Sequence, residues 1–474
     1  MKPLNFRAIP HYTWSHRWVL LSAVITVVGL FLGGYWFFRN LTLSPYGRGL
    51  MCCDAARYLW LSTAPIDQVV SYAADRSFGY PFFLALFRQL SPTFGQEFFL
   101  RSAFATQFAC SLLSSTILYW GIRSTGLKVP VVCYALLLAH PALAGIAAVP
   151  LADSLAASFA VMFIGIVALI CHSQNLLWLK CLALGLLASL ILSVRPSNLP
   201  FLFMWSATFP IIACWGTFAR RREYLATLKT FTVSVGAFII GLLPVGGHLV
   251  NNCYTAYKQI CLIAPVSATG NMAGSLEMNY HYSRTWGTVD PAKSWQWRYT
   301  ADQILENCTI SYSTPLDSIK KCYQANLTKL PHHFLHRAIG LFDYRHLNPY
   351  AALETSNSDF WALRSFAAIS IIGVIACAAL MLLHLFRGTL YEHGYLLLPL
   401  SYFGVQITLH TENRYLLPIL PCFFILGTAS LLGNPFKNKW VHMTCLCLAG
   451  LIVAYSLHLV LVWDESALQL IGSR

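Results

Sequence analysis

Charged residues are scarce in this sequence. Only 11% of its 474 residues are charged, whereas a soluble chain of this length normally carries about a quarter. Apolar residues make up 57% of the chain, and the mean hydropathy is +0.58. This composition excludes an ordinary soluble protein. Apolar runs of about 20 residues recur along the chain and predict an all-α, polytopic membrane protein.

Three further features that the sequence lacks disfavour certain classes of function. The sequence has no evident tandem repeat, which disfavours a transporter built from inverted repeats. The apolar runs are nearly free of charge in their middles, where transporters place ionisable residues. The segments expected to face inward lack a glycine-rich phosphate-binding loop, which fits chemistry that needs no soluble nucleotide.

Basic residues exceed acidic ones, and the formal net charge is +14. They cluster at the ends of apolar runs, which indicates membrane topology rather than nucleic-acid binding. With the N-terminus in the cytoplasm, the short outward turns carry only Arg195 and Arg414, which therefore need another explanation. The first run, Trp18–Phe38, is interpreted as a retained signal anchor because no small-residue cleavage site follows it.

About eleven membrane spans are predicted, in three parts. Residues 1–250 form an N-terminal membrane module, 251–362 a small outward subdomain, and 363–474 the last helices. The first outward loop, 39–98, contains the apolar stretch Phe78–Phe87, which predicts a short helix in the interface or dipping back into the membrane. The spans are expected near 18–38, 99–121, 129–147, 153–171, 176–194, 199–216, 230–250, 363–386, 393–409, 415–433 and 440–463.

Cysteines and sequons bear on the compartment. Four cysteines are expected to face outward, where disulfides form, and their pairing is left open. Three acceptor sequons also lie in outward segments, although such tripeptides often arise by chance. A bacterial inner membrane is favoured, and an endoplasmic reticulum lumen stays open. The residues concerned are Cys253, Cys261, Cys308 and Cys322, and Asn40, Asn307 and Asn326.

The most informative acidic residue is Asp54, which follows the first predicted span in the segment CCDAARYL (residues 52–59). A carboxylate at the membrane surface can serve as a general base that deprotonates an acceptor hydroxyl, or as a ligand for a divalent metal ion. The alternative is a solvated loop residue or a helix cap.

Three segments resemble motifs of the GT-C superfamily of membrane glycosyltransferases. DAARYLWL (54–61) is similar to its acidic first-loop motif, GYPFFLAL (79–86) looks like its stretch before the second span, and ENRYLLPILP (412–421) resembles its Arg-Tyr…Pro segment. The superfamily includes protein O-mannosyltransferases and the aminoarabinose transferases of lipid A. The resemblance implies an inverting sugar transfer from a polyprenyl-phosphate carrier to an acceptor hydroxyl on the outer face. Many members have two adjacent first-loop acids, whereas a cysteine precedes Asp54 here, which argues against metal binding by neighbouring carboxylates.

The resemblance also assigns roles to residues. Asp54 would be the base, and Asp153 resembles an acid at the outward start of a middle span. Arg195 and Arg414 would contact the carrier phosphate, whose oxygens match the guanidinium fork. As alternatives, Asp153 is a first-turn residue, Arg195 lies in a plain turn, and Arg414 snorkels or pairs with Glu412. The other predicted substrate contacts are Arg57, Tyr58, Arg76, Tyr80, Glu412 and Tyr415. For Arg57 and Arg76 the alternative is a solvated loop residue, which such arginines more often are.

Two other functions remain. A polysaccharide polymerase or ligase would place its key residues in the late outward loop, and a transporter is less favoured. His332, His333 and His336 have spacing for a metal ion, but a membrane-surface helix is the stronger interpretation. The sugar stays open, as does the acceptor, which is a glycolipid, a polysaccharide or a protein. The late-loop candidates are Arg284, His332, Arg337 and Arg345.

Overall fold

The computed structural model of the protein is built from helices. Every regular element in the described part of the chain is an α-helix or a short 3-10 helix, which confirms the all-α prediction. The structure describes residues 16–43, 53–71, 77–89, 93, 95–221, 223–262, 316–342, 357–409, 413–436 and 438–472.

Seven of the described helices are long and apolar enough to cross a membrane. They confirm a multi-pass membrane protein, which implies association with a lipid bilayer. Each lies at the position of a predicted span. They are α1 (His16–Leu43), α9 (Ala152–His172), α10 (Leu177–Val194), α11 (Leu199–Arg221), α12 (Tyr224–Tyr257), α16 (Asn357–Phe386) and α20 (Lys439–Gly472).

The other four predicted spans are also helical, but they are shorter, interrupted or less apolar, so the count of eleven is not confirmed. One is broken between α7 and α8, because Pro141 starts a new helix and holds His140 in an extended conformation. Another is divided among α17, η4 and α18. The elements are α6 (Gln96–Ser124), α7 (Val131–Leu138), α8 (Pro141–Ala147), α17 (Leu390–His393), η4 (Gly394–Leu396), α18 (Leu397–Leu409) and α19 (Leu420–Leu432).

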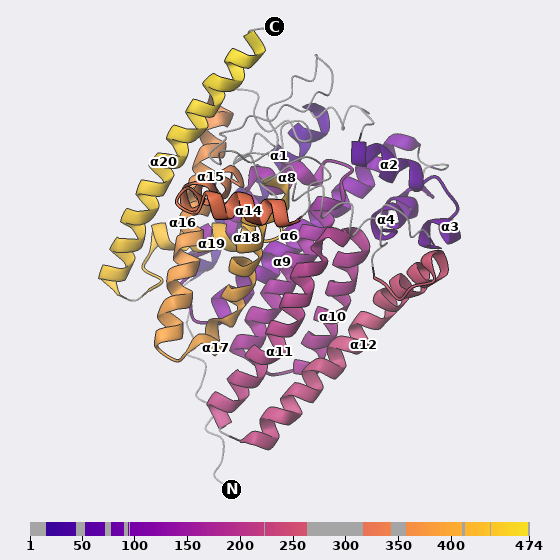
Figure 1. Ribbon diagram of the computed structural model, residues 1–474, viewed down its shortest axis with the longest axis horizontal. Coiled ribbons are helices and arrows are strands. Elements are labelled where there is room, and N and C mark those ends of the chain that lie inside the picture. The colour runs from indigo at the N-terminus through magenta and orange to yellow at the C-terminus, as the bar shows by residue number, and fades with distance from the viewer. Residues whose placement is uncertain are drawn as a thin grey trace.

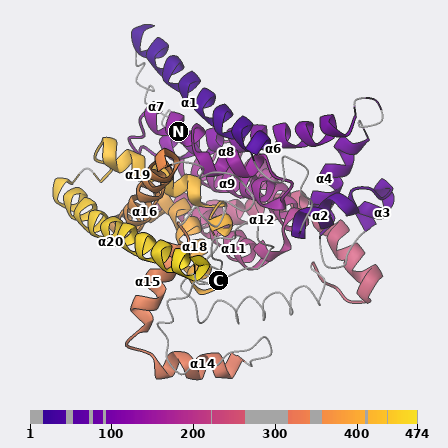
Figure 2. The ribbon, with the colours of Figure 1, turned by 90° about the horizontal axis from the view of Figure 1, so that it is seen from above.

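The long helices pack in a single bundle. The most extensive helix–helix contacts are those of α10 with α12, α6 with α9, and α16 with α19. α20 runs along the outside of the bundle, and α2 and α4 lie on the side away from it (Figures 1 and 2). At the α16–α19 crossing, a Cβ on Gly373 would collide with the Phe423 carbonyl, so the two backbones touch, as is common between membrane helices.

Shorter helices lie at the periphery of the bundle (Figure 2). The first-loop helices are α2 (Cys53–Leu61), α3 (Ile66–Ser71) and α4 (Gly79–Arg88), and α4 confirms the short helix predicted at Phe78–Phe87. The segment between α12 and α16 contributes α14 (Leu316–Ala325) and α15 (Leu330–Gly340). In Figure 1, α2 and α4 lie at the end opposite the turn that joins α11 to α12.

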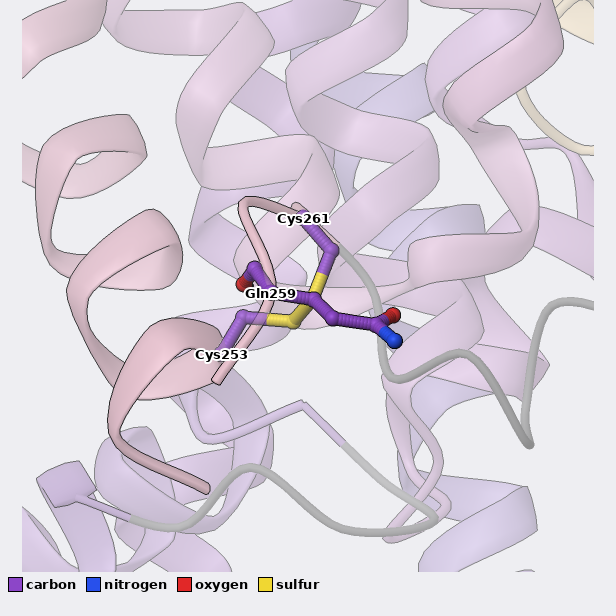
Figure 3. Close-up of a disulfide and its surroundings, with 3 residues drawn as sticks. All are labelled: Cys253, Gln259 and Cys261. Atoms are coloured by element: carbon purple, nitrogen blue, oxygen red, sulfur yellow. Dashed lines mark hydrogen bonds between the residues drawn. A yellow bond between two sulfur atoms is a disulfide. The ribbon is translucent and has the colours of Figure 1, made fainter. Parts of the chain in front are cut away.

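A disulfide closes the chain just beyond α12. Cys253, in the last turns of α12, is bonded to Cys261 in the segment that follows, with Cα atoms 5.6 Å apart (Figure 3). Cys322 in α14 is disulfide-bonded as well. The predicted disulfides are therefore confirmed for these cysteines, while Cys308 lies outside the described residues. Such bonds persist in oxidising compartments.

Two of the three sequon asparagines are buried. Asn40 donates its side-chain N–H to the carbonyl of Trp36, at 2.8 Å, and Asn326 donates to the carbonyl of Cys322, at 2.9 Å. Glycosylation requires an exposed amide nitrogen, so neither asparagine is an acceptor in this fold. Asn307 lies outside the described residues.

Candidate functional site

Three of the predicted site residues are only partly described or not described. Asp54 is the second residue of α2, but its side chain lies outside the described part of the structure. Arg76 and Glu412 lie outside it altogether. The described part of the site consists of the residues around these three positions.

Asp153 and Arg195 form an ion pair. Asp153 lies in the first turn of α9, and Arg195 directly follows α10. Because a short turn joins these antiparallel helices, the start of α9 and the end of α10 lie at the same end of the bundle. Pro196 ends α10 and leaves Arg195 in an extended conformation. The two side chains are only 4% and 14% exposed, so the pair is largely desolvated.

Tyr415 brings the two exceptional arginines together. It lies in η5 (Asn413–Tyr415), the turn that precedes α19. The guanidinium carbon of Arg195 lies 4.5 Å from the centre of the Tyr415 ring, and that of Arg414 lies 5.1 Å from it. Arg414 also donates to the Tyr415 hydroxyl, at 3.5 Å. Cations favour such positions over an aromatic face.

Asn198 is a site residue that the sequence analysis missed. It ends η1 (Pro196–Asn198), is 3% exposed, and accepts a hydrogen bond from the Tyr402 hydroxyl at 3.3 Å. Its side-chain nitrogen has no hydrogen-bond partner among the described residues. A buried amide donor therefore lies within the segment that presents Arg195. The available signal was the segment RPSN (195–198) itself, of which only the arginine was assigned a role.

Apolar packing brings the first-loop helices to this site. Tyr58 and Leu59 of α2 belong to the same buried cluster as Ala152 and Val194. Ala152 precedes Asp153, and Val194 precedes Arg195. Asp54 lies one turn before Tyr58 in the helix, so the start of α2 is near the end of the bundle that carries the ion pair.

Gly79 allows α4 to touch the end of α10. A Cβ on Gly79 would lie 2.6 Å from the carbonyl carbon of Ser193, closer than real Cβ atoms approach. Ser193 is two residues before Arg195, so this contact fixes α4 against the segment that carries the arginine. Glycine is needed here for close approach of two backbones.

Tyr80 is completely buried beside this contact. Its hydroxyl donates to Oε1 of Gln107 at 2.7 Å, and the Gln107 amide donates to the carbonyls of Ala147 and Val149 at 2.9 and 3.1 Å. This network ties α4 to α6 and to the turn before α9. Desolvation by burial raises the pKa of the Tyr80 hydroxyl well above its usual value. These contacts position α4, and a substrate contact by Tyr80 stays a prediction.

Substituting Tyr80 by phenylalanine should destabilise the protein by about 1–3 kcal/mol, because the buried Gln107 carbonyl loses its donor. The pH dependence of the stability should change too. Because the pKa of Tyr80 is raised in the folded protein, its contribution to stability is fully present below the unfolded-state pKa of about 10, and this contribution is lost as the pH rises above that value. Thermal unfolding in detergent from pH 7 to 11 measures both effects. Tyr224→Phe, an exposed control, should change neither, and an unchanged Tyr80→Phe protein would contradict the network.

Arginines also organise α2. The guanidinium carbon of Arg57 lies 4.7 Å from the centre of the exposed Trp60 ring. Arg88, at the end of α4, donates to Ser62 Oγ at 3.3 Å and to the Leu59 carbonyl at 3.4 Å, which fastens the C-terminus of α2. Burial lowers the pKa of Arg88. The substrate role of Arg57 stays a prediction.

The described late-loop residues are engaged in packing. Arg337 is completely buried and donates its Nε–H to the carbonyl of Ile407 in α18. His336 forms a hydrogen bond with the Tyr455 hydroxyl of α20 at 2.8 Å, and the centre of its ring lies 4.2 Å from that of the His332 ring, to which it is tilted. No group of three or more metal-ligating side chains occurs among the described residues. Arg284 and Arg345 lie outside them, so the polymerase alternative gains no support from this part of the chain.

Comparison of the chain with protein-family models, with curated proteins and with solved structures finds no match. The site must therefore be interpreted from its own geometry, and the resemblance of its motifs to the GT-C superfamily stays a prediction.

Proposed function

We propose that the protein is a GT-C type glycosyltransferase that moves a sugar from a polyprenyl-phosphate carrier to an acceptor hydroxyl at the outer face of a membrane. The observation that supports this most is the meeting of Arg195 and Arg414 on Tyr415, at the end of the bundle that carries α2. Two guanidinium groups at span ends suit a phosphate at the membrane surface, and the apolar helices around them suit its tail.

The ion pair has a positioning role in this proposal. Asp153 fixes one side of the Arg195 guanidinium, and the Tyr415 ring supports its face. Arg195 therefore loses little side-chain entropy when it binds a phosphate oxygen. Asn198 supplies a further N–H donor for the phosphate or the sugar. Arg57, Tyr58 and the undescribed residues Arg76 and Glu412 remain candidates for contacts to the sugar.

The chemical step is one displacement. The acceptor hydroxyl oxygen bonds to the anomeric carbon while the bond from that carbon to the phosphate oxygen breaks, and polyprenyl phosphate leaves with the electron pair. Asp54 takes the hydroxyl proton. Negative charge grows on the phosphate in the transition state, where Arg195 and Arg414 stabilise it. Attack from the side opposite the leaving group inverts the anomeric configuration.

The proposed orientation places this site outside. The basic residues that flank the spans lie mainly in segments assigned to the cytoplasm, with the N-terminus. The Cys253–Cys261 disulfide joins the last turns of α12 to the segment after it. His248 and Asn252, near the same end of α12, form hydrogen bonds with the carbonyl of Val70 in α3. A disulfide indicates an oxidising compartment, which fits the outer face. The first loop contacts the same end of α12, so it belongs on that face as well. Eleven spans and a bacterial inner membrane belong to this proposal.

Binding of the carrier can be tested without knowing the sugar. Polyprenyl phosphate, the product that the reaction releases, should raise the unfolding temperature of the purified protein. At a hundredfold excess over its Kd the stabilisation is about 2.7 kcal/mol. Arg414→Gln should lose most of it, whereas Arg387→Gln, at the opposite end of the bundle, should retain it. A wild-type protein that ignores polyprenyl phosphate, or an Arg414→Gln protein that responds fully, would contradict the assignment.

A further inference from the structure

Two buried amide groups beside the Arg195 site have an atom without a hydrogen-bond partner. The side-chain nitrogen of Asn198 in η1 and Oε1 of Gln406 in α18 are both enclosed, and neither has a partner among the described residues. Each of the two residues is 3% exposed. An unpaired polar atom in such a place costs the fold free energy, and binding of a ligand is a reason to keep it. We propose that these two amides bind one hydroxyl group of the transferred sugar.

Tyr402 joins the two amides in one cluster. Its hydroxyl donates to Oδ1 of Asn198 at 3.3 Å and contacts the side chain of Gln406, which lies one turn later in α18. The backbone N–H of Asn198 donates to the carbonyl of Arg195 at 3.2 Å, which closes the turn between them. The cluster therefore adjoins the arginine that is proposed to bind the carrier phosphate. A transferred sugar is bonded directly to that phosphate, so its hydroxyls are expected here.

Helix α18 is fixed on both sides of this cluster. Near its start, the indole N–H of Trp205 donates to the carbonyl of Leu398 at 3.1 Å. Near its end, Arg337 donates its Nε–H to the carbonyl of Ile407. The Tyr402 ring also packs on Trp205, with the ring centres 5.9 Å apart. The donor and the acceptor are therefore held in place before a ligand arrives, as a selective binding site requires.

The chemistry of the two atoms selects the ligand group. The Asn198 nitrogen can only donate a hydrogen bond, and Gln406 Oε1 can only accept one. A single hydroxyl accepts from the first and donates to the second. A phosphate or carboxylate oxygen would leave the acceptor unpaired, and a protonated amine would leave the donor unpaired. The inference rests on the proposed function and deepens it, because it names the sugar group that is recognised.

The test compares polyprenyl phosphate with polyprenyl-phosphate mannose, glucose and arabinose. The dependence of the unfolding temperature on lipid concentration gives the affinity of the purified protein for each. At least one sugar should raise the affinity about tenfold over polyprenyl phosphate, the value of one good hydrogen bond. Gln406→Met has a similar length without the amide, so it should lose this gain and bind polyprenyl phosphate normally. Gln174→Met, in the turn at the opposite end of α9 and α10, should keep both.

Monodeoxy analogues of the preferred sugar test whether one hydroxyl is recognised. In the wild type, removal of that hydroxyl should lower the affinity about tenfold. In Gln406→Met the same removal should change the affinity by no more than about twofold, because its partner is already absent. If no monodeoxy analogue behaves in this way, and each loss simply multiplies with that of Gln406→Met, the inference is overturned.

Failure of the inference and failure of the proposed function give different results. Equal affinities for polyprenyl phosphate and all three sugar lipids would overturn the inference alone, and a buried water would then pair the two amides. Unchanged sugar affinity in Gln406→Met would overturn it too. Binding of none of the four lipids would overturn the proposed function and this inference with it. If Gln406→Met fails to fold, Asn198→Asp, which keeps the acceptor for Tyr402 but lacks the amide donor, decides the question.

Discussion

Replacement of Asp54 by asparagine is expected to lower sugar transfer by a factor of about 100 to 10,000, the usual contribution of a general base. Asparagine has nearly the same shape as aspartate but cannot accept the proton of the acceptor hydroxyl. Asp54 is the second residue of α2, whose Tyr58 and Leu59 remain packed against Ala152 and Val194, so the fold should persist. Transfer of radiolabel from polyprenyl-phosphate sugars to a native membrane extract measures the effect.

The matched control for this variant is Asp67→Asn. Asp67 lies in α3 of the same first loop and is exposed. Its replacement removes the same charge from the same loop, so it should leave transfer within about twofold of the wild type, as expected for a surface change far from any special feature. Equal losses in the two variants would mean that general loop charge, rather than the base at Asp54, supports transfer.

The second large effect concerns the buried ion pair. Arg195→Gln alone should cost about 3–5 kcal/mol of stability, because it leaves the Asp153 carboxylate desolvated and without its cation. The double variant Asp153→Asn/Arg195→Gln removes both charges and should recover most of this loss. Transfer should nevertheless stay abolished in the double variant, because the phosphate has lost the Arg195 contact. Thermal unfolding and transfer assays on the same samples separate the two roles.

A second ion pair provides the control. Arg39 of α1 donates to Asp359 of α16 at 2.8 Å, across a different helix contact, and Arg39 also stacks on Trp36. The double variant Arg39→Gln/Asp359→Asn should change stability in the same manner and keep transfer. If the Asp153→Asn/Arg195→Gln protein is as active in transfer as the Arg39→Gln/Asp359→Asn control, the Asp153–Arg195 pair stabilises the fold alone and does not bind the donor.

The sequence predicts the positions of the helices well, because long apolar runs need only composition to be recognised. It predicts α4 from a short apolar stretch between arginines, and the outward disulfides from their compartment. It cannot fix the exact number of spans, because α6 carries polar residues and Pro141 divides the segment that forms α7 and α8. In these two segments, polar residues and a proline work against the formation of one long apolar helix, so the apolar pattern alone does not give the number of spans.

The arrangement of the site depends on helix packing, which the sequence pattern does not specify. The order of residues gives no sign that Asp153 pairs with Arg195, or that Arg195 and Arg414 share the Tyr415 ring. The connectivity alone could have predicted that the start of α9 and the end of α10 lie at the same end of the bundle, since a short turn joins these two helices. Gln107 gave no signal, because a single polar residue inside an apolar helix reveals its role only once its partner Tyr80 is in place.

The most direct test of the central claim uses the purified wild-type protein, one radiolabelled polyprenyl-phosphate sugar at a time, and a native membrane extract as acceptor. The account predicts that label from at least one donor enters an acceptor with inverted anomeric configuration, and that Asp54→Asn at equal protein level abolishes this transfer. Transfer from no donor, transfer with retention, or undiminished transfer by Asp54→Asn would contradict it.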